Sequence, residues 1–346
     1  MILFHNDYNQ TCHPAILERL GQIAPCQVDG YGEDDFCRNA ADLIRKACGN
    51  ADLPVHFLSG GTQSNLTVIA AALRPHQGVI TAQSGHIHVH ETGAIEATGH
   101  KILPVPSVDG KITASQIQQA VTDHWNDSTH EHIAQPKLVY ISHPTEFGTT
   151  YTLAELEDIS ATCRKNGLYL YMDGARLGYA LAARDNDVFL PDLARLCDAF
   201  YIGGTKVGAM LGEAVVIPNA AIAEDFRYLI KQRGGMLAKG WLMGVQFQVL
   251  FEDNLYQKIS RHADEMADRI RKTLTDCGCR MTIFSNTNQI FVTMDDAVLE
   301  QLGKEFSYAH WDRPAPGYST VRFCTSWATR AVDVDALCDK IRQLTR

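Results

Sequence analysis

The stretch LYLYMDGAR, residues 168–176, decides the fold class of this chain. Its apolar first half reads as a buried strand, and Asp173 follows directly after it. In α/β proteins, ligands bind where parallel strands reach their carboxyl ends. Burial there raises the pKa of a carboxyl unless a cation or proton donor answers it. Asp173 is therefore suited to a metal, a ribose hydroxyl or a protonated ring nitrogen, and the alternative is an Asp that caps the next helix.

Segments on both sides of this stretch alternate short apolar runs with amphipathic ones. The run at 53–61 indicates a strand and a turn that lead into a helix at 62–73. The clearest other helix spans 153–166, because Thr152 can cap it and Gly167 can end it. Further short strands are predicted at residues 78–82, 101–105, 137–142, 168–172, 199–202 and 213–217. This alternation predicts an α/β fold with a mostly parallel sheet covered on both faces.

The chain changes texture after about residue 252. A charged amphipathic helix is followed by short strands and helices, at residues 255–275, 281–284, 289–293, 296–304, 319–323 and from 332 onward. This α+β pattern suits a smaller second domain. We therefore divide the chain into a large domain with the N-terminal segment, 1–250, and a small C-terminal domain, 251–346. Helices at 14–21 and 37–48 are expected to pack on the large domain or on a partner subunit.

Composition excludes several classes of protein. The 346 residues carry a net charge of −9 and no long basic block, which argues against nucleic acid as a partner. No apolar run is long enough to cross a membrane, and the first residues lack the pattern of a secretory signal. The ten cysteines form no Cys-x-x-Cys pair, so we expect reduced thiols in a cytoplasmic protein.

The segment SGGTQSN, residues 59–65, lies between an apolar strand and a helix. Its glycines permit a tight turn, and the helix start directs unpaired N–H groups at one point. With the hydroxyls of Ser59 and Thr62 beside Gly61, this predicts a phosphate site. It lacks the lysine and spacing of the nucleotide P-loop. A plain strand–helix turn would use the same residue types.

The segment AFYIGGTK, residues 199–206, is an apolar strand that ends in Lys206. A lysine at a desolvated strand end can have a lowered pKa and act as an amine nucleophile, although surface lysines after strands are common. Another candidate is SGHIHVHE, residues 84–91. If it is extended, its three histidines share a face and form a possible metal site. A histidine stacked on a flat ring and histidines in a loop or first helix turn are the alternatives.

Taken together, these segments predict a pyridoxal phosphate site at one sheet edge. The turn at 59–65 holds the phosphate, Asp173 keeps the pyridine nitrogen protonated, and Lys206 forms the Schiff base. His86 supplies a planar group that can stack on the ring. We expect no metal in this site.

At this point the chain resembles the threonine aldolase/aromatic amino acid β-eliminating lyase family, of the aspartate-aminotransferase-like fold. The segments that carry the resemblance are FHNDYNQTCHP, YGEDDF, SGGTQSN, GHIHVHETGAIEATGHKI, HPTEFGTTYTLAEL, MDGAR, GGTKVGAMLGEAVV and VRFCTSW. They cover almost all of the large domain and reach the small one. The pair MDGAR and GGTK, in this order and spacing, is the specific part.

The resemblance implies roles for further residues. It implies the Schiff-base lysine for Lys206 and the pyridine-nitrogen partner for Asp173, and it places Arg176 near the phenolate oxygen of the ring. Arg322 matches the arginine that binds the substrate carboxylate, which suits a bidentate guanidinium. Other implied contacts are His86 on the ring, Ser59, Gly61 and Thr62 at the phosphate, Asn6 near the carboxylate, and Lys231 or Lys239 as a phosphate contact from a neighbouring subunit.

One segment departs from the family pattern. Many threonine aldolases carry Glu-Asn-Thr-His-Asn, whose histidine approaches the β-hydroxyl of the substrate. Here the stretch is SHPTEF, residues 142–147, so Glu146 is a candidate for that role, whereas His143 is displaced from the aligned position. His86 and Glu146 are thus the two candidates for the catalytic base.

The resemblance implies an aldolase that cleaves β-hydroxy-α-amino acids, L-threonine and L-allo-threonine, to glycine and an aldehyde. It also implies a homodimer or homotetramer. The first alternative is another pyridoxal phosphate lyase that eliminates from an aromatic or sulfur amino acid. The second is a metal hydrolase built on His86, His88 and His90. The third is a non-catalytic binding protein, which requires Lys206 to face solvent.

Overall fold

A seven-stranded sheet forms the centre of the computed structural model, which describes residues 1–345. Its strands, in spatial order, are β2 (Val55–Leu58), β8 (Glu213–Val216), β7 (Ala199–Gly203), β6 (Tyr169–Asp173), β5 (Gln135–Ser142), β3 (Gln77–Ala82) and β4 (Lys101–Val105). Strands β4, β3, β5, β6 and β7 pair in parallel, and β8 runs antiparallel to both of its neighbours. The predicted mostly parallel sheet is confirmed.

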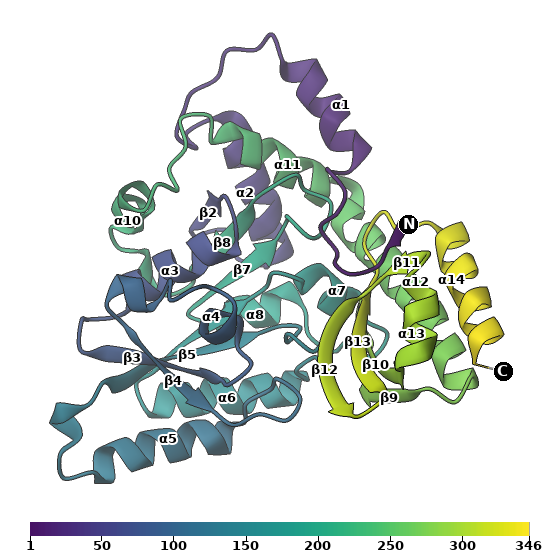
Figure 1. The fold of residues 1–346 in the computed structure, drawn as a ribbon. Coiled ribbons are helices and arrows are strands. Elements are labelled where there is room, and N and C mark those ends of the chain that lie inside the picture. The colour runs from purple at the N-terminus through teal and green to yellow at the C-terminus, as the bar shows by residue number, and fades with distance from the viewer. Residues whose placement is uncertain (346) are drawn as a thin grey trace.

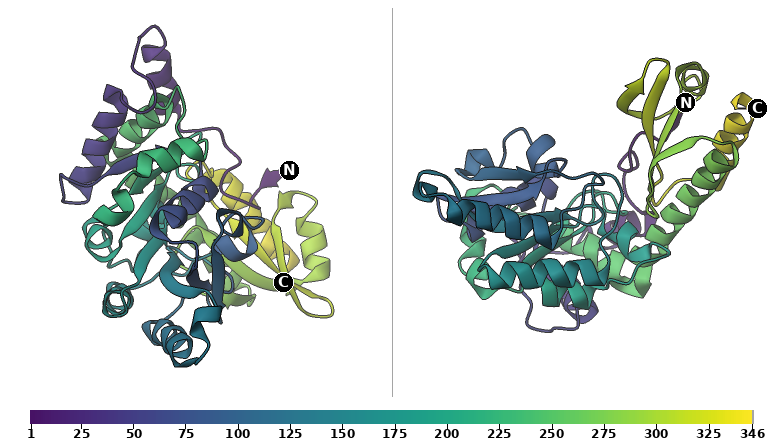
Figure 2. Two further views of the ribbon diagram at one scale, coloured as in Figure 1. Left: turned by 90° about the vertical axis from the view of Figure 1, so that its left-hand side faces the viewer. Right: turned by 90° about the horizontal axis from the view of Figure 1, so that it is seen from below.

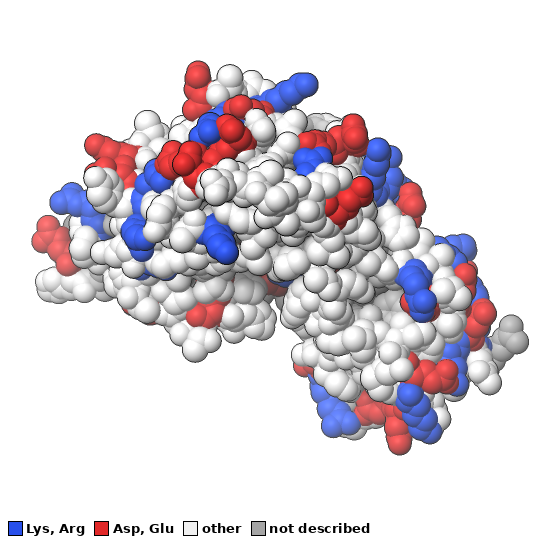
Figure 3. Space-filling view, turned by 90° about the horizontal axis from the view of Figure 1, so that it is seen from above, with Lys and Arg blue, Asp and Glu red and all other residues white. Residues whose placement is uncertain are grey.

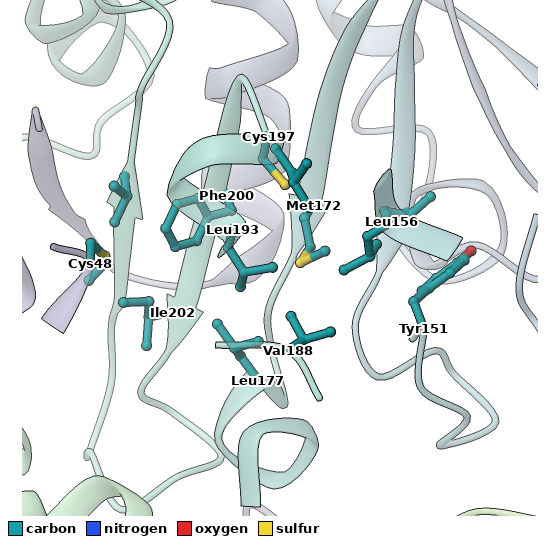
Figure 4. Close-up of a cluster of buried hydrophobic side chains, with 14 of the residues drawn as sticks. Cys48, Tyr151, Leu156, Met172, Leu177, Val188, Leu193, Cys197, Phe200 and Ile202 are labelled. Atoms are coloured by element: carbon teal, nitrogen blue, oxygen red, sulfur yellow. The ribbon is translucent and has the colours of Figure 1, made fainter. Parts of the chain in front are cut away.

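Both faces of this sheet are covered, because successive side chains of its strands enter two different apolar clusters. In β6, Leu170 and Met172 join one cluster, while Tyr169 and Tyr171 join the other. Figure 4 shows part of the first cluster, in which Met172 lies near Phe200 and other buried side chains. This explains why these strands are apolar throughout instead of alternating with polar residues.

Helices of the large part connect and cover these strands (Figure 1). They are α3 (Gly61–Ala72), α4 (His86–Val89), α5 (Ala114–Asn126), α6 (Leu153–Lys165), α7 (Leu177–Ala182), α8 (Leu190–Leu196), α9 (Ala220–Ala223), α10 (Phe226–Gln232) and α11 (Trp241–Phe251), with short 3-10 turns η1 (Glu96–Thr98), η2 (His130–His132) and η3 (Glu252–Asn254). Helix α6 begins with the expected Thr152 cap, closed by Glu155 into a capping box. Gly167 follows it in a left-handed conformation, as predicted.

Helix α11 is an element that sequence periodicity did not reveal. It is apolar on nearly all sides and has seven buried residues, so it lacks the amphipathic pattern of a surface helix. It packs against α2 (Asp35–Ala47) and α1 (Pro14–Ile23). A Cβ on Gly244 of α11 would lie 2.6 Å from the backbone nitrogen of Cys37, so this glycine permits the close approach of α2. The N-terminal helices therefore pack on the large part.

The C-terminal part stands to one side of the large sheet (Figures 1 and 2). Its antiparallel sheet has the order β12 (Ala309–Ala315), β13 (Tyr318–Cys324), β10 (Gln289–Asp295) and β9 (Arg280–Ile283), beside helices α12 (Leu255–Asp276), α13 (Asp296–Leu302) and α14 (Ala331–Leu344). Strand β12 was not predicted. It is an edge strand, largely exposed and containing Pro314, so its sequence has no apolar alternation.

The N-terminus belongs spatially with this C-terminal part. Strand β1 (Ile2–Leu3) pairs in parallel with β11 (Phe306–Ser307), and Phe4 is buried in the same apolar cluster as Phe306. The division of the chain at residues 250 and 251 stays a prediction. What the structure adds is that residues 2–4 lie in the smaller part and the chain then crosses to the larger one.

Two features concern the expected partners: the distribution of charge on the surface and the length and polarity of the helices. Figure 3 shows acidic and basic side chains interspersed over the face seen from above. Among residues 1–345, no helix combines the length and apolar character that crossing a membrane requires.

Candidate active site

A cavity of about 250 Å³ lies at the carboxyl ends of β5, β6 and β7. It brings together most of the predicted site residues: Ser59, Gly61, Thr62, His86, Glu146, Asp173, Arg176 and Lys206 all line it. Segments more than 100 residues apart in the chain thus meet at one edge of the sheet, as the alternating pattern predicts.

The start of α3 forms one wall of this cavity. Gly60 is its N-cap and offers no side-chain cap, so the first N–H groups of the helix remain open for an anion. The Ser59 hydroxyl and N–H both donate to Oε1 of Gln63, at 2.8 and 3.2 Å, which shapes the turn. A Cβ on Gly61 would lie 2.9 Å from the Tyr201 hydroxyl, so the turn needs glycine there.

Asp173 is buried in the cavity wall and is surrounded by hydrogen-bond donors. Tyr140 and Tyr201 donate to its two oxygens at 2.6 and 2.5 Å, and the Asn65 amide donates at 3.1 Å. Burial raises the pKa of Asp173, but His86 and the two phenols outweigh that effect, so its pKa lies below its usual value. The carboxylate is thus held ionised.

The alternative role of Asp173 as a helix cap is wrong. The next helix, α7, begins at Leu177, and its N-cap is Arg176. Asp173 is instead the last residue of β6, one residue further into the strand than predicted. It accepts the backbone N–H of Ala175 at 2.9 Å, which turns the chain at the sheet edge.

Lys206 follows β7 and is partly buried in the cavity wall. Burial lowers the pKa of its ammonium group, and the nearby Arg176 lowers it further, against the opposing effect of Asp7, Asp173 and Glu213. A lowered pKa makes the neutral amine more available as a nucleophile. The alternative of a non-catalytic binding protein requires Lys206 to face solvent, and this requirement is not met.

Arg176 lines the cavity but is paired with a residue that sequence reasoning missed. Its guanidinium donates twice to Asp7, at 2.7 and 2.9 Å, and Asn288 donates to the same carboxylate at 2.8 Å. Although burial raises the pKa of Asp7, Arg176 brings it down to about 2. Asp7 lies within the quoted segment FHNDYNQTCHP, so the resemblance pointed at the segment without assigning this residue.

His86 is oriented by another residue that was missed. Its Nδ1 lies 2.7 Å from Oε1 of Glu91, whose side chain is fully buried. The same oxygen accepts the Asn65 amide at 2.7 Å, and that amide also donates to Asp173. Asn65, on α3, therefore bridges the carboxylates of Glu91 and Asp173.

The extended metal-binding face of three histidines is wrong. Residues 86–89 form the short helix α4, in which His86 faces the cavity and packs 5.5 Å from the ring of His90, while His88 is exposed. Within residues 1–345, no group of three or more His, Cys, Asp or Glu side chains is placed to hold a metal ion. The short helix turn, one of the alternatives, is what forms.

Glu146 lies beside His86. Its Oε1 accepts the backbone N–H of His86 at 2.9 Å and the Ser142 hydroxyl at 2.7 Å. Burial raises the pKa of Glu146 above its usual value, against the lowering effect of the Ser142 hydrogen bond. His143 is fully buried away from the cavity, with its pKa lowered to about 4 by burial, which agrees with its displaced position.

Four predicted residues do not line the cavity. Arg322 on β13 donates to Gln289 and to the backbone oxygen of His5, both at 3.1 Å, while its buried Nε keeps no partner. Asn6 lies in a local turn, where it accepts the N–H of Tyr8. Lys231, stacked on Tyr31, and Lys239 are both exposed, and their expected role concerns a neighbouring subunit.

Comparisons with known proteins agree with this geometry. The family model of beta-eliminating lyases matches residues 9–297. The low-specificity L-threonine aldolase of Pseudomonas sp. strain NCIMB 10558 is 31% identical over 316 residues, which cover 90% of this chain and 89% of that protein. The solved threonine aldolase of Leishmania major is 46% identical, with a TM-score of 0.97 over 100% of both chains.

A more distant comparison concerns the fold alone. Thermus thermophilus aspartate aminotransferase superposes with a TM-score of 0.73 at 15% identity, covering 99% of this chain and 91% of that one. The expected aspartate-aminotransferase-like fold is confirmed.

Proposed function

Since the chain belongs to the beta-eliminating lyase family, we propose that it is a low-specificity threonine aldolase. It is a carbon–carbon lyase that cleaves L-threonine and L-allo-threonine to glycine and acetaldehyde with pyridoxal 5′-phosphate as cofactor. The observation that carries this proposal is the placement of Lys206, with its lowered pKa, in one cavity with the ionised Asp173 and the uncapped start of α3.

The residues present fit pyridoxal phosphate. The open N–H groups of α3 and the hydroxyl of Thr62 suit a phosphate, and the ionised Asp173 suits a protonated pyridine nitrogen. Lys206 would hold the cofactor through its side-chain amine. When bound, the cofactor supplies a ring that accepts electrons from the substrate.

The chain itself holds the charges that this chemistry needs. Tyr140, Tyr201 and Asn65 keep Asp173 ionised by donating to it, so it can hold a proton on a ring nitrogen. Arg176 forms an ion pair with Asp7, and its positive charge lowers the pKa of the nearby Lys206, which favours the neutral amine. These groups are fixed before substrate arrives, which favours the charged state that the reaction develops.

We assign the substrate contacts to three residues. Arg322 binds the α-carboxylate, and its unpartnered Nε is the free donor that supports this role. His86 takes the proton from the β-hydroxyl, because Glu91, 2.7 Å from its Nδ1, orients the ring and leaves the other ring nitrogen for the substrate. Glu146, with its raised pKa, is the competing base.

The proposal extends to assembly and compartment. We propose a homodimer or homotetramer in which Lys231 or Lys239 of one subunit reaches the phosphate of its neighbour, and the exposure of both lysines supports this. A cytoplasmic location is proposed because all ten cysteines are free and seven of them are buried, which fits a reducing compartment.

The decisive experiment measures the products. Incubation of the purified enzyme with L-threonine should release glycine and acetaldehyde in equal amounts, with a visible absorption band from the lysine-bound cofactor. Release of ammonia and a keto acid from an aromatic or sulfur amino acid, without glycine from threonine, would instead support the β-eliminating alternative.

A further inference from the structure

Glu213 lies between the two segments that the proposed function uses. It is the first residue of β8 and pairs on one side with Gly203, at the end of the strand before Lys206. On the other side it pairs with Leu58, directly before the turn that begins at Ser59. Its side chain is almost completely buried and lines the same cavity. A carboxyl group therefore stands between the anion turn and the lysine loop.

The carboxylate of Glu213 organises the loop that carries Lys206. Oε2 accepts the backbone N–H of Gly204 at 2.9 Å, and Oε1 lies 2.9 Å from the hydroxyl oxygen of Thr205. The same hydroxyl oxygen accepts the backbone N–H of Gly212 at 3.1 Å. Thr205 also lines the cavity.

The protonation state of Glu213 determines the direction in which the Thr205 hydroxyl donates. A threonine hydroxyl has one proton to donate and can accept two hydrogen bonds. While Glu213 is ionised, the Thr205 proton is directed at Oε1. When Glu213 is protonated, its own O–H donates to the Thr205 oxygen, and the Thr205 proton becomes free to point into the cavity.

The surroundings of Glu213 allow this exchange near neutral pH. Burial raises its pKa to about 8, against the lowering effect of Lys206 and of the Thr205 and Gly204 hydrogen bonds. Asp173, on β6, raises it further. The other titratable groups around it are the phenols of Tyr171, Tyr201 and Tyr256, whose pKa values burial raises far enough to keep them neutral.

We propose that Glu213 is a positioning residue that takes up a proton when a phosphate group enters the cavity, so that Thr205 donates its hydroxyl to that phosphate. This inference rests on the proposed function. Protonation also removes a negative charge from the wall that a phosphate dianion must approach. The cationic side chains that line the cavity are Lys206 and Arg176, and Arg176 is already paired with Asp7.

The test is calorimetric titration of the apoenzyme with pyridoxal 5′-phosphate and with pyridoxal, which lacks the phosphate. The pH values are 7 and 9.5, because a phosphate monoester with a second pKa near 6 is a dianion at both. From pH 7 to pH 9.5, the affinity for pyridoxal 5′-phosphate should fall about tenfold more than the affinity for pyridoxal. A tenfold change corresponds to the loss of one hydrogen bond to a charged group. Buffers of different ionisation enthalpy should reveal about 0.3 of an extra proton taken up with the phosphate compound at pH 9.5, because a tenfold gain raises the pKa of Glu213 from about 8 by roughly one unit.

Glu213→Gln separates this role from a structural one, because its amide can donate permanently to Thr205. In this variant the extra proton uptake should disappear. Its affinity for pyridoxal 5′-phosphate should fall between pH 7 and pH 9.5 no more than its affinity for pyridoxal does. Thr205→Ser should retain both effects and Thr205→Val should lose both, which decides the matter if Glu213→Gln does not fold.

The outcomes distinguish this inference from the proposed function. Failure of wild-type enzyme to bind pyridoxal 5′-phosphate at either pH would defeat both. Normal binding with the same pH dependence and proton uptake in wild type and Glu213→Gln would overturn the role of Glu213 alone.

Discussion

The pair formed by Asp7 and Arg176 allows a quantitative prediction. Replacing Asp7 with Asn keeps the shape of the side chain but removes the charge that answers a guanidinium at the cavity wall. The surroundings lower the pKa of Asp7 from 3.8 to about 2. At 1.36 kcal/mol per pKa unit, Asp7→Asn should lower the free energy of unfolding at pH 7 by about 2 kcal/mol.

The sign of the pH dependence follows from the direction of the shift. Because the folded-state pKa of Asp7 is lowered, its contribution is complete above about pH 4 and disappears as the pH falls through 2. The difference in stability between wild type and Asp7→Asn should therefore narrow between pH 4 and pH 2.

Urea unfolding of the apoenzyme, followed by tryptophan fluorescence, measures these differences. Asp42→Asn is a matched control, because Asp42 also pairs with an arginine but is exposed, and it should cost no more than about 0.5 kcal/mol. In the double variant Asp7→Asn/Arg176→Met, part of the loss should be recovered, since the unanswered buried charge is gone. Equal, small losses for Asp7→Asn and Asp42→Asn would refute a buried ion pair at this wall.

Further predictions concern the site and its surroundings. Lys206→Ala should abolish turnover and the visible band of the bound cofactor, and normal turnover would contradict the assignment. Arg322→Ala should raise the Michaelis constant for threonine at unchanged cofactor content, because it removes about 2–5 kcal/mol of substrate binding. Arg322→Lys should restore part of that binding, and an unchanged Michaelis constant in the alanine variant would exclude the carboxylate contact. Glu91→Gln should lower kcat at least tenfold with full cofactor loading, whereas Glu96→Gln, a nearby exposed carboxyl, should not; equal rates would remove Glu91 from the orientation of His86. Finally, the pKa of His143 is lowered to about 4, so this residue favours the folded state above pH 6.5 and loses that contribution as the pH falls. Between pH 7 and pH 5 that loss should be about 2 kcal/mol and absent in His143→Gln, as urea midpoints would show.

Much of the fold follows from local pattern. Strands β3 to β7 and helix α6 were predictable because their residues are apolar over a strand's length or recur on one helix face. Helix α11 and strand β12 were not, since the first is apolar on nearly all sides and the second is an exposed edge. Their type is decided by what packs against them, which a sequence window does not contain.

The site divides in the same way. Lys206, Asp173 and the turn at Ser59 to Thr62 were found from the sequence, because each follows an apolar strand and their combined order is specific to one chemistry. Asp7, Glu91 and Glu213 were not, although each sets the charge or orientation of a group in the cavity. Each lies in a segment that the sequence analysis quoted, but nothing in the local pattern marks the acidic side chain itself.

The sequence by itself determined the fold class and the groups that react, because periodicity and strand-end residues are local properties of the chain. Only the tertiary structure decided which partners those groups have. Arg176 meets Asp7 across 169 positions, and Asn65 meets Asp173 across 108. Hydrogen bonds and burial act over a few ångströms in space whatever the separation along the chain, so the pKa values and orientations of these groups exist only once the sheet has brought the segments together.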